Sequence, residues 1–480
     1  MKYLDKSIVE INELLKNKTI KPIDLVEEAF ENIESHKELN AYITLNKEEA
    51  IKRAKELENV EVDNILFGLP IAIKDNIVTK DLRTTCASHI LDNFIPIYDA
   101  TVVEKIKKAN MIIIGKTNMD EFAMGSSSRT SYFGAPHNPW NKDKISGGSS
   151  GGSATTMAAH DVLFALGTDT GGSIRQPAAY TGIVGMKPTY GRVSRYGLVA
   201  FASSLDQIGP MTRNVYDNAL LLNVIAGKDN KDLTSSNKET EDFTRLIGED
   251  INGMKIAIPN YFMGDIVSSD IKEQVEKVIN ILKDKGCTVD FIDMKYLENA
   301  VNLYQIIAMG EASSNLARYD GIRYGHAAEN ITDINDLYYE TRSNGFGEEV
   351  KRRIMVGSYL LSGDNAKIYY NKALSIRDDI KEEFNKVFKD YDFVIGPTTT
   401  TTAYDLNDPM DDPNKSFMDD VLVIPVNMAG LPGLNLPIGF SNNMPVGMQI
   451  IANSFEEAKI YKLASFLEKE LNLNLNPFNK

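Results

Sequence analysis

Two glycine-flanked serine loops constrain this chain more than any other feature. Residues 146–173 read SGGSSGGSATTMAAHDVLFALGTDTGGS, in which the loops GGSSGGS and TDTGGS are separated by a helix-like spacer and a short apolar run. Glycine at this density lets serines sit in tight turns and brings backbone N–H groups within reach of an anionic oxygen. Ser149 and Ser173 lie 24 residues apart, one in each loop. The pattern therefore favours acyl transfer through a serine nucleophile.

A lysine at the end of an apolar run is a candidate general base. The run ILFGLPIAI at 65–73 predicts a buried strand, and Lys74 follows it directly. A lysine can accept a proton from a serine only when burial or a neighbouring charge lowers its pKa toward neutrality. A second serine can relay the proton, because a hydroxyl both donates and accepts. The backbone amides of Thr170, Gly171 and Gly172 are candidates for stabilising the oxyanion, and each such donor is worth about 2.7–4 kcal/mol.

Composition excludes several other classes of function. The five histidines lie outside any HExxH or HxH arrangement, so we expect no metal site. The chain has no GxGxxG, and no GK[ST] follows its glycine-rich loops, which argues against nucleotide binding here. The formal net charge of −15 disfavours direct binding to a nucleic-acid phosphate backbone. Two distant cysteines, no secretory h-region and no apolar run of about 18 residues lead us to expect a cytoplasmic protein.

Alternating apolar runs and amphipathic stretches predict an α/β fold. Helix patterns fill residues 5–58 between breaks and return at 101–109, 154–160, 270–285 and 455–470. Further short apolar runs predict strands at 111–115, 162–166, 254–260, 287–292, 392–397, 421–426 and 445–452. Polar surface segments are expected at 229–247 and 403–416.

The expected organisation is a single large domain over 1–480, with a mixed central sheet covered by helices on both faces. No obvious linker interrupts the region that carries the lysine and the two serines. The domain would comprise an N-terminal helical segment (about 1–60), a catalytic region (65–215) and a helical insertion (about 300–385).

The order and spacing of these motifs resemble the amidase signature family. In that family a lysine follows a strand with the pattern G-x-P-x-x-x-K-D, and this chain has GLPIAIKD at 68–75. The family's other two catalytic groups are a serine of GGSS that follows a cis peptide bond and the serine of GTDTGGSIRQPA. The resemblance implies that Lys74 is the base, Ser149 the bridging serine and Ser173 the nucleophile. The neighbouring serines are then expected to be structural: Ser146, Ser150 and Ser153.

Longer motifs resemble one branch of this family, the glutaminase subunits of tRNA-dependent amidotransferases. They are NMDEFAMGSS (118–127), GMKPTYGRVSRYGL (185–198), SSLDQIGP (203–210), EEVKRRIM (348–355) and PVNMAGLPG (425–433). The resemblance implies that an arginine holds the glutamine α-carboxylate and an aspartate its α-amino group, a pairing that suits their charges. The residues implied are Arg353 and Asp420, with Tyr304 lining the same pocket; Arg352 and Asp419 are adjacent competitors for these roles.

The resemblance also implies partners and cofactors. Ammonia from glutamine would pass to a kinase-like, tRNA-binding B subunit, which uses ATP and magnesium to amidate Glu-tRNA(Gln) or Asp-tRNA(Asn). A small C subunit would complete a heterotrimer, and tRNA would be contacted mainly through the partner. The missing nucleotide loop and the acidic charge of this chain fit that division of labour. No cofactor and no membrane contact are expected for the chain itself.

Two other functions are consistent with parts of the sequence. A stand-alone amidase of the same family would keep the catalytic triad and cleave a different amide. A non-catalytic assembly protein would keep the fold alone. Taken singly, a glycine-rich loop usually makes turns, and a charged run such as EEVKRR is usually an exposed helix face. Only the joint occurrence of all the motifs, in order, favours catalysis on glutamine.

Overall fold

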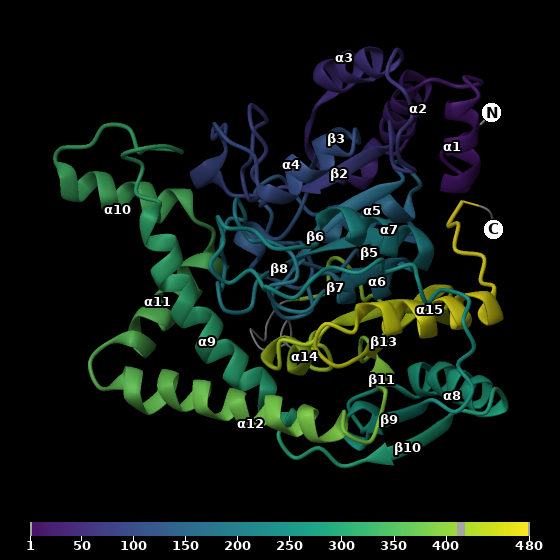
Figure 1. The fold of residues 1–480 in the computed structure, drawn as a ribbon. Coiled ribbons are helices and arrows are strands. Elements are labelled where there is room, and N and C mark those ends of the chain that lie inside the picture. Colours follow the sequence, from purple (N-terminus) through teal and green to yellow (C-terminus); the bar gives the residue numbers. More distant parts are fainter. Residues whose placement is uncertain (1, 410–417, 479–480) are drawn as a thin grey trace.

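A mixed sheet built from strands of nearly the whole chain lies at the centre of the molecule (Figure 1). The computed structural model describes residues 2–409 and 418–478. Within these ranges the sheet has 11 strands in the order β1-β3-β2-β6-β8-β7-β12-β13-β11-β9-β10. Their bounds are β1 (Tyr42–Leu45), β2 (Pro70–Lys74), β3 (Ile112–Thr117), β6 (Phe164–Asp169), β7 (Val184–Lys187), β8 (Gln207–Thr212), β9 (Lys255–Pro259), β10 (Thr288–Ile292), β11 (Phe393–Pro397), β12 (Gly433–Ser441) and β13 (Met444–Ile451). A separate hairpin pairs β4 (His137–Asn138) with β5 (Asn141–Ile145).

The pairing of strands brings Lys74 and the second serine loop to the same end of the sheet. β2 lies between β3 and β6 and runs parallel to both, so the carboxyl ends of these strands point the same way. β2 ends at Lys74, and β6 ends at Asp169, just before the second serine loop. From β6 onward the pairs β6–β8, β8–β7, β7–β12, β12–β13 and β13–β11 are antiparallel. The carboxyl ends of parallel strands are where open α/β sheets place their ligands.

Helices cover both faces of the sheet, as expected. Every residue of β2, β3, β6 and β8 is buried, which requires cover on each side. The helices are α1 (Ile8–Lys16), α2 (Pro22–Ser35), α3 (Lys47–Leu57), α4 (Thr101–Lys108), α5 (Gly151–Ala158), α6 (Arg175–Thr181), α7 (Val215–Ile225), α8 (Ser269–Asp284), α9 (Ala300–Asn315), α10 (Ile334–Gly345), α11 (Glu348–Leu361), α12 (Asn371–Val387), α14 (Ile424–Met428) and α15 (Glu457–Leu471). Within the described ranges, no helix is both long and apolar enough to span a bilayer.

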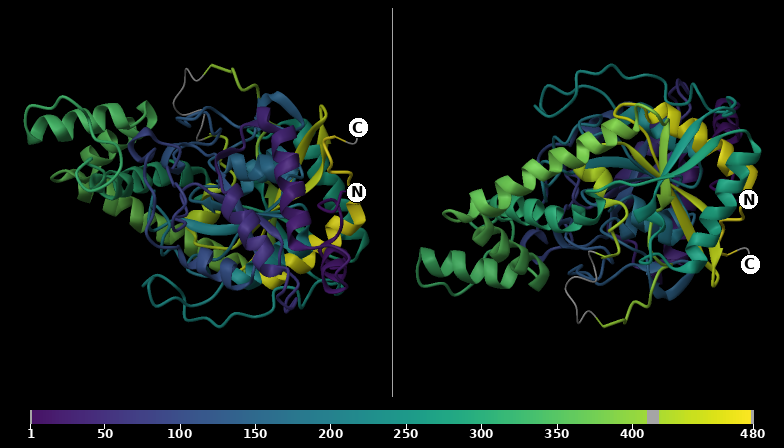
Figure 2. Two further views of the ribbon diagram at one scale, coloured as in Figure 1. Left: turned by 90° about the horizontal axis from the view of Figure 1, so that it is seen from above. Right: turned by 90° about the horizontal axis from the view of Figure 1, so that it is seen from below.

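Residues 300–387 form a group of helices that projects from the body of the molecule. Figures 1 and 2 show α10 farthest from the sheet, with α9, α11 and α12 leading back to it. α9 packs against α11, α12 and α14, so its inner end reaches the sheet region. The inner ends of these helices therefore lie against the body of the molecule, and their outer ends stand away from it.

The predicted strand at 421–426 is wrong. The chain turns at Asp420, whose carbonyl accepts the N–H groups of Val423 and Ile424, and then forms the short helix α14. Pro425 lies in the first turn of that helix, where its missing N–H costs nothing, whereas a central strand would lose a ladder bond. The run is apolar because α14 is buried. The strand of this region is β12, which the apolar pattern did not predict.

Of the two predicted polar surface segments, the structure describes the first completely and the second in part. Residues 229–247 contain no helix or strand, but Phe243 within them is fully buried beneath the guanidinium of Arg192. Of the segment 403–416, residues 410–416 lie outside the described part of the chain.

Candidate active site

Lys74 ends β2 with its side chain completely buried among hydroxyl groups. Its Nζ lies 2.7 Å from Ser149 Oγ, 2.8 Å from Ser150 Oγ and 2.9 Å from Thr168 Oγ1. Thr168 belongs to β6, parallel to β2, and the two serines lie in the turn that leads into α5. The expected cis peptide bond between Gly148 and Ser149 is present. The structure therefore places the predicted base and the predicted bridging serine in direct contact.

The surrounding hydrogen bonds direct the Lys74 amine toward Ser149. Ser150 Oγ donates its single proton to the Thr168 carbonyl at 3.1 Å and accepts the Thr168 N–H at 3.2 Å. Thr168 Oγ1 accepts an N–H from Asn76 Nδ2 at 3.1 Å. A neutral amine has two N–H groups and one lone pair. When Ser150 and Thr168 accept the two N–H groups, the lone pair faces the hydroxyl of Ser149.

Sequence reasoning missed three members of this arrangement. Ser150 was expected to be structural, and its Oγ contacts Lys74 directly, so its hydrogen bonds help to orient the amine. Thr168 and Asn76 were not predicted. The available signal was proximity: Ser150 is next to Ser149, Asn76 is two residues beyond Lys74, and Thr168 stands at the end of an apolar run. Ser153, by contrast, donates to the carbonyl of Leu166 at 2.9 Å, as a structural serine would.

Burial gives Lys74 the acidity that a lysine base needs. It lowers the pKa of Lys74 to about 7, although the carboxylates of Asp120, Asp169 and Asp206 oppose the shift. A large fraction of the amine is therefore neutral near neutral pH and can accept a proton.

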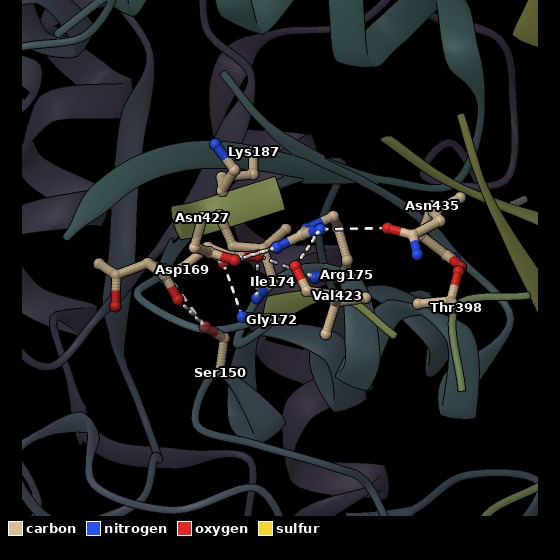
Figure 3. Close-up of polar contacts among 12 residues, drawn as sticks. Ser150, Asp169, Gly172, Ile174, Arg175, Lys187, Thr398, Val423, Asn427 and Asn435 are labelled. Atoms are coloured by element: carbon tan, nitrogen blue, oxygen red, sulfur yellow. Dashed lines mark hydrogen bonds and ion pairs between the residues drawn. The ribbon is translucent and has the colours of Figure 1, made fainter. Parts of the chain in front are cut away.

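Asp169 shapes the nucleophile loop, residues 170–174, around its own carboxylate (Figure 3). Its Oδ1 accepts the Gly172 N–H at 2.8 Å, and its Oδ2 pairs with Arg175 Nε at 3.1 Å. Asn427 Nδ2, from α14, donates to Oδ1 at 2.8 Å. Burial by itself would raise the pKa of Asp169, but the ion pair with Arg175 outweighs it and the pKa lies below its usual range. A buried, paired carboxylate thus fixes the loop's backbone.

Ser173 lies in this loop beside the first serine loop. Its carbonyl accepts the Ser150 N–H at 3.2 Å, and the residue is 5% exposed. The predicted nucleophile, bridging serine and base therefore come from three adjacent segments at the carboxyl edge of β2 and β6.

One of the three predicted oxyanion donors, the amide of Gly172, already has a partner within the protein. The amide of Gly172 is engaged by Asp169, so this N–H holds the loop together. The side chain of Thr170 is fixed by a hydrogen bond from its Oγ1 to Asp206 Oδ1 at 2.7 Å. The amides of Thr170 and Gly171 stay candidates for the oxyanion role.

The predicted pocket residues Tyr304 and Asp420 touch the nucleophile loop itself. A Cβ added at Gly171 would lie 2.7 Å from the Tyr304 ring, and one added at Gly172 would lie 2.8 Å from Asp420 Oδ1. Tyr304 comes from α9, and Asp420 comes from the turn before α14. Side chains at either glycine would collide with these groups, so the two glycines allow the pocket to approach the nucleophile.

Asp420, rather than its neighbour Asp419, suits a cationic ligand. Asp419 Oδ2 accepts hydrogen bonds from Ser126 Oγ at 3.0 Å and from Tyr404 at 2.8 Å. Asp420 Oδ1 is buried and has no hydrogen-bond partner among the described residues. Burial, together with the charges of Asp419 and Asp169, raises the pKa of the Asp420 carboxyl well above its usual range. An ammonium group would compensate this buried carboxylate.

Arg353, rather than Arg352, faces the protein interior. Its side chain is 4% exposed, its Nε donates to Glu349 at 2.6 Å, and its guanidinium lies 5.4 Å from the centre of the Phe201 ring. Arg352 is 32% exposed and is bound through two nitrogens to the same carboxylate. Burial raises the pKa of Tyr304, and the charge of Arg353 opposes that rise, which places the arginine near the pocket.

Among the residues that the structure describes, no three His, Cys, Asp or Glu side chains group in a way that suits a metal ion. The two cysteines, Cys86 and Cys287, are buried free thiols.

A lysine and two serine loops on an α/β sheet define the class of protein, and sequence comparison agrees. The sequence model of the Amidase family matches residues 24–461, which include the serine loops, α9, α11 and Asp420. The chain belongs to this family.

Relatives that are more than half identical to this chain share one name. The A subunit of glutamyl-tRNA(Gln) amidotransferase from Pediococcus pentosaceus is 54% identical over 471 residues, covering 98% of this chain and 97% of the relative. The protein of the same name from Listeria monocytogenes is 53% identical over 473 residues, with 98% of both chains covered.

Solved structures show the same fold. The crystal structure of the A subunit of glutamyl-tRNA(Gln) amidotransferase from Thermotoga maritima matches with a TM-score of 0.83 and 40% identity, covering 99% of this chain and 97% of the other. Peptide amidase from Stenotrophomonas maltophilia matches with a TM-score of 0.84 at 25% identity, covering 100% and 99%.

Proposed function

We propose that this chain is the glutaminase subunit of a cytoplasmic tRNA-dependent amidotransferase. It hydrolyses glutamine through Lys74, Ser149 and Ser173 and supplies ammonia to a partner protein. The observation that carries the proposal is the contact of 2.7 Å between Lys74 Nζ and Ser149 Oγ, in a setting that turns the amine's lone pair toward that hydroxyl.

The reaction begins with proton transfer along the two serines. Neutral Lys74 accepts the proton of Ser149, which accepts that of Ser173 as the Ser173 Oγ attacks the side-chain amide carbon of glutamine. The carbonyl oxygen becomes an anion that the amides of Thr170 and Gly171 stabilise. The relay then returns a proton to the departing nitrogen, the C–N bond breaks, and ammonia leaves. Water attacks the γ-glutamyl ester by the same relay, releasing glutamate and restoring the Ser173 hydroxyl.

The pocket orients glutamine by charge. Arg353 binds the α-carboxylate, Asp420 binds the α-ammonium, and Tyr304 packs beside Gly171 to close one wall. Because Tyr304 and Asp420 both contact the nucleophile loop, recognition of the backbone end of glutamine fixes its side-chain amide over Ser173.

The later steps take place on partners. A kinase-like B subunit binds tRNA, ATP and magnesium and amidates Glu-tRNA(Gln), or Asp-tRNA(Asn), with the ammonia; a small C subunit completes the heterotrimer. The relatives at 53–54% identity bear the name of one subunit of such an enzyme, which supports this division. The net charge of −15 also suits a chain that leaves RNA to its partner.

The test is glutaminase activity of the complex co-expressed with its B and C subunits. Ser173→Ala is expected to reduce kcat by roughly 10⁴-fold or more, because the covalent route is lost. Ser465→Ala, on α15 far along the chain, is the matched control and should retain normal rates. Near-normal turnover by Ser173→Ala would refute the mechanism. A stand-alone amidase would instead be indicated if Arg353→Ala left glutamine turnover intact while other amides were cleaved as well.

A further inference from the structure

Glu121 is a buried carboxylate that the proposed reaction does not use. It lies in the motif NMDEFAMGSS, directly after Asp120, and is 2% exposed. Its two oxygens accept the backbone N–H of Gly347 at 3.1 Å and 3.0 Å. The residues in contact are 226 positions apart in the chain, so the contact joins the catalytic region to the projecting helices.

Gly347 is the residue that precedes the first turn of α11. A carboxylate at this position binds an N–H group that has no partner within the helix and also lies at the positive end of the helix dipole. The approach is close: a Cβ added at Gly347 would lie 2.4 Å from Glu121 Oε2. Glycine at 347 therefore permits the contact, and Glu121 defines where α11 begins.

Two further contacts hold the same junction between α10 and α11. Ser88 Oγ lies 2.5 Å from Glu121 Oε1 and 3.3 Å from the carbonyl of Gly345. Phe122 packs edge-on against Phe346, with ring centres 5.7 Å apart. Each of the three residues at the junction of α10 and α11, 345–347, is therefore in contact with Ser88, Glu121 or Phe122.

The residue before Glu121, Asp120, contacts the first serine loop. The N–H of Asp120 donates to the carbonyl of Ser149 at 3.3 Å, and Asp120 Oδ2 accepts the Ser128 N–H at 2.9 Å. The N–H of Glu121 donates to Thr130 Oγ1 at 3.0 Å. A short rigid path therefore runs from Ser149 through Asp120 and Glu121 to the start of α11.

α11 carries the arginine of the proposed glutamine pocket. Arg353 lies in the second turn of the helix, and Glu349, in its first turn, binds the Arg353 Nε. We infer that Glu121 is a positioning residue for glutamine: by anchoring the start of α11 to the segment behind Ser149, it sets the distance between Arg353 and the nucleophile. The inference rests on the proposed function, since it assigns Arg353 to the glutamine α-carboxylate.

The experiment compares Glu121→Ala and Glu121→Gln in the co-expressed complex. Loss of the anchor in Glu121→Ala is expected to raise KM for glutamine roughly ten- to a hundredfold through displacement of Arg353, with kcat within about twofold of normal. Glu121→Gln keeps an acceptor for Gly347 and a donor for Ser88, so it should restore most of the affinity. In an Arg353→Ala background, Glu121→Ala should have no further effect on KM, because the two residues act on one interaction.

A substrate without the carboxylate separates positioning from general damage. 4-Aminobutanamide has the amide and the amino group of glutamine but not its α-carboxylate, so Glu121→Ala should leave its turnover unchanged. An equal loss on both substrates, a fall in kcat at constant KM, or a full effect in the Arg353→Ala background would overturn the inference.

Failure of the proposed function has a different signature. If the normal complex does not hydrolyse glutamine, the function is wrong. The anchor itself is then read from hydrogen exchange of the Gly347 amide, which Glu121→Ala should accelerate and Glu121→Gln should not. Unchanged exchange in Glu121→Ala would show that the carboxylate does not hold α11.

Discussion

Lys74 is a cation-forming group surrounded by neutral hydroxyls, and this environment decides when it can act as a base. Each neighbour has a defined hydrogen-bonding role: Ser150 donates to a carbonyl, and Thr168 accepts from Asn76. Neither supplies a negative charge in direct contact with the amine. The nearby carboxylates only moderate the effect of burial on its pKa.

The pH dependence of glutamine turnover should report the titration of Lys74. Its pKa of about 7 lies far below the usual value, so the amine is protonated below pH 7 and has no lone pair for Ser149. We expect kcat/KM to rise with pH, falling about tenfold per unit below an apparent pKa near 7. Lys74→Arg should abolish activity, because a guanidinium stays protonated at every accessible pH.

Lys187 is a matched control for this assignment. Burial, with the charge of Arg175, lowers its pKa to about 7 as well, but its Nζ donates to the carbonyl of Pro188 at 3.0 Å. Lys187→Met, with folding checked by its Tm, should still show the fall in kcat/KM below pH 7. Two results would show that Lys74 is not the base. One is a kcat/KM that stays constant from pH 6 to 8.5 in the normal enzyme, and the other is loss of the fall below pH 7 in Lys187→Met.

Asp420 should discriminate substrates by their α-amino group. Asp420→Asn keeps the shape of the side chain but removes the charge that pairs with the ammonium, an interaction worth about 1.5–3 kcal/mol. We expect KM for glutamine to rise roughly ten- to a hundredfold. Turnover of glutaramate, which lacks the amino group, should not change. Asp419→Asn is the control, since Ser126 and Tyr404 already bind that carboxylate; an equal effect of both variants would argue against a specific ammonium site.

At the scale of elements, apolar runs predicted seven of the 11 strands of the sheet, and burial did not separate the predicted strands from the missed ones, because β7 and β8 are fully buried and β10 is largely exposed. β2, β3, β6, β9, β10, β11 and β13 all fall on predicted strands, within a few residues at their ends. β7 and β8 were missed because VGMK and QIGPMT contain no two adjacent apolar side chains, proline aside. Their extended form depends on their pairing with each other and with β12 and β6. The opposite error at 421–426 arose because a buried helix of two turns or less is as apolar as a buried strand.

The residues of the site also divide into those that a local motif marks and those that only the folded structure reveals. Lys74, Ser149 and Ser173 could be located from the sequence because each lies in a local motif at the end of a strand or loop. The roles of Thr168, Asn76 and Glu121 depend on contacts between segments 92 to 226 positions apart. Such contacts follow from strand order and helix placement, which local pattern does not specify.

At the scale of the whole molecule, the chain combines a central sheet with a group of projecting helices. Lys74, Ser149, Ser173 and Asp169 lie on or beside the central strands, where Lys74 and Asp169 are bonded to buried groups. Arg353 and Tyr304 come from α11 and α9, whose outer parts stand away from the sheet (Figure 1). Two of the three proposed glutamine-binding residues therefore lie on the projecting helices, whereas Asp420 precedes α14; Tyr304 and Asp420 meet at the nucleophile loop. The hydrogen bond between Glu121 and the Gly347 N–H is one of the contacts that hold the projecting helices against the sheet region.

The overall charge gives a prediction about the binding of tRNA under the proposed function. With 67 acidic and 52 basic side chains, the isolated chain repels a phosphate backbone. We expect it to bind tRNA more weakly than about 10⁻⁴ M at 150 mM salt in a filter-binding assay, with little change at 50 mM salt, because few counterions are released. The complex with the B and C subunits should bind in the same assay and lose affinity steeply as salt increases. Micromolar, salt-sensitive binding by the isolated chain would contradict the proposed division of labour, since it would require a basic surface strong enough to overcome the net charge of −15.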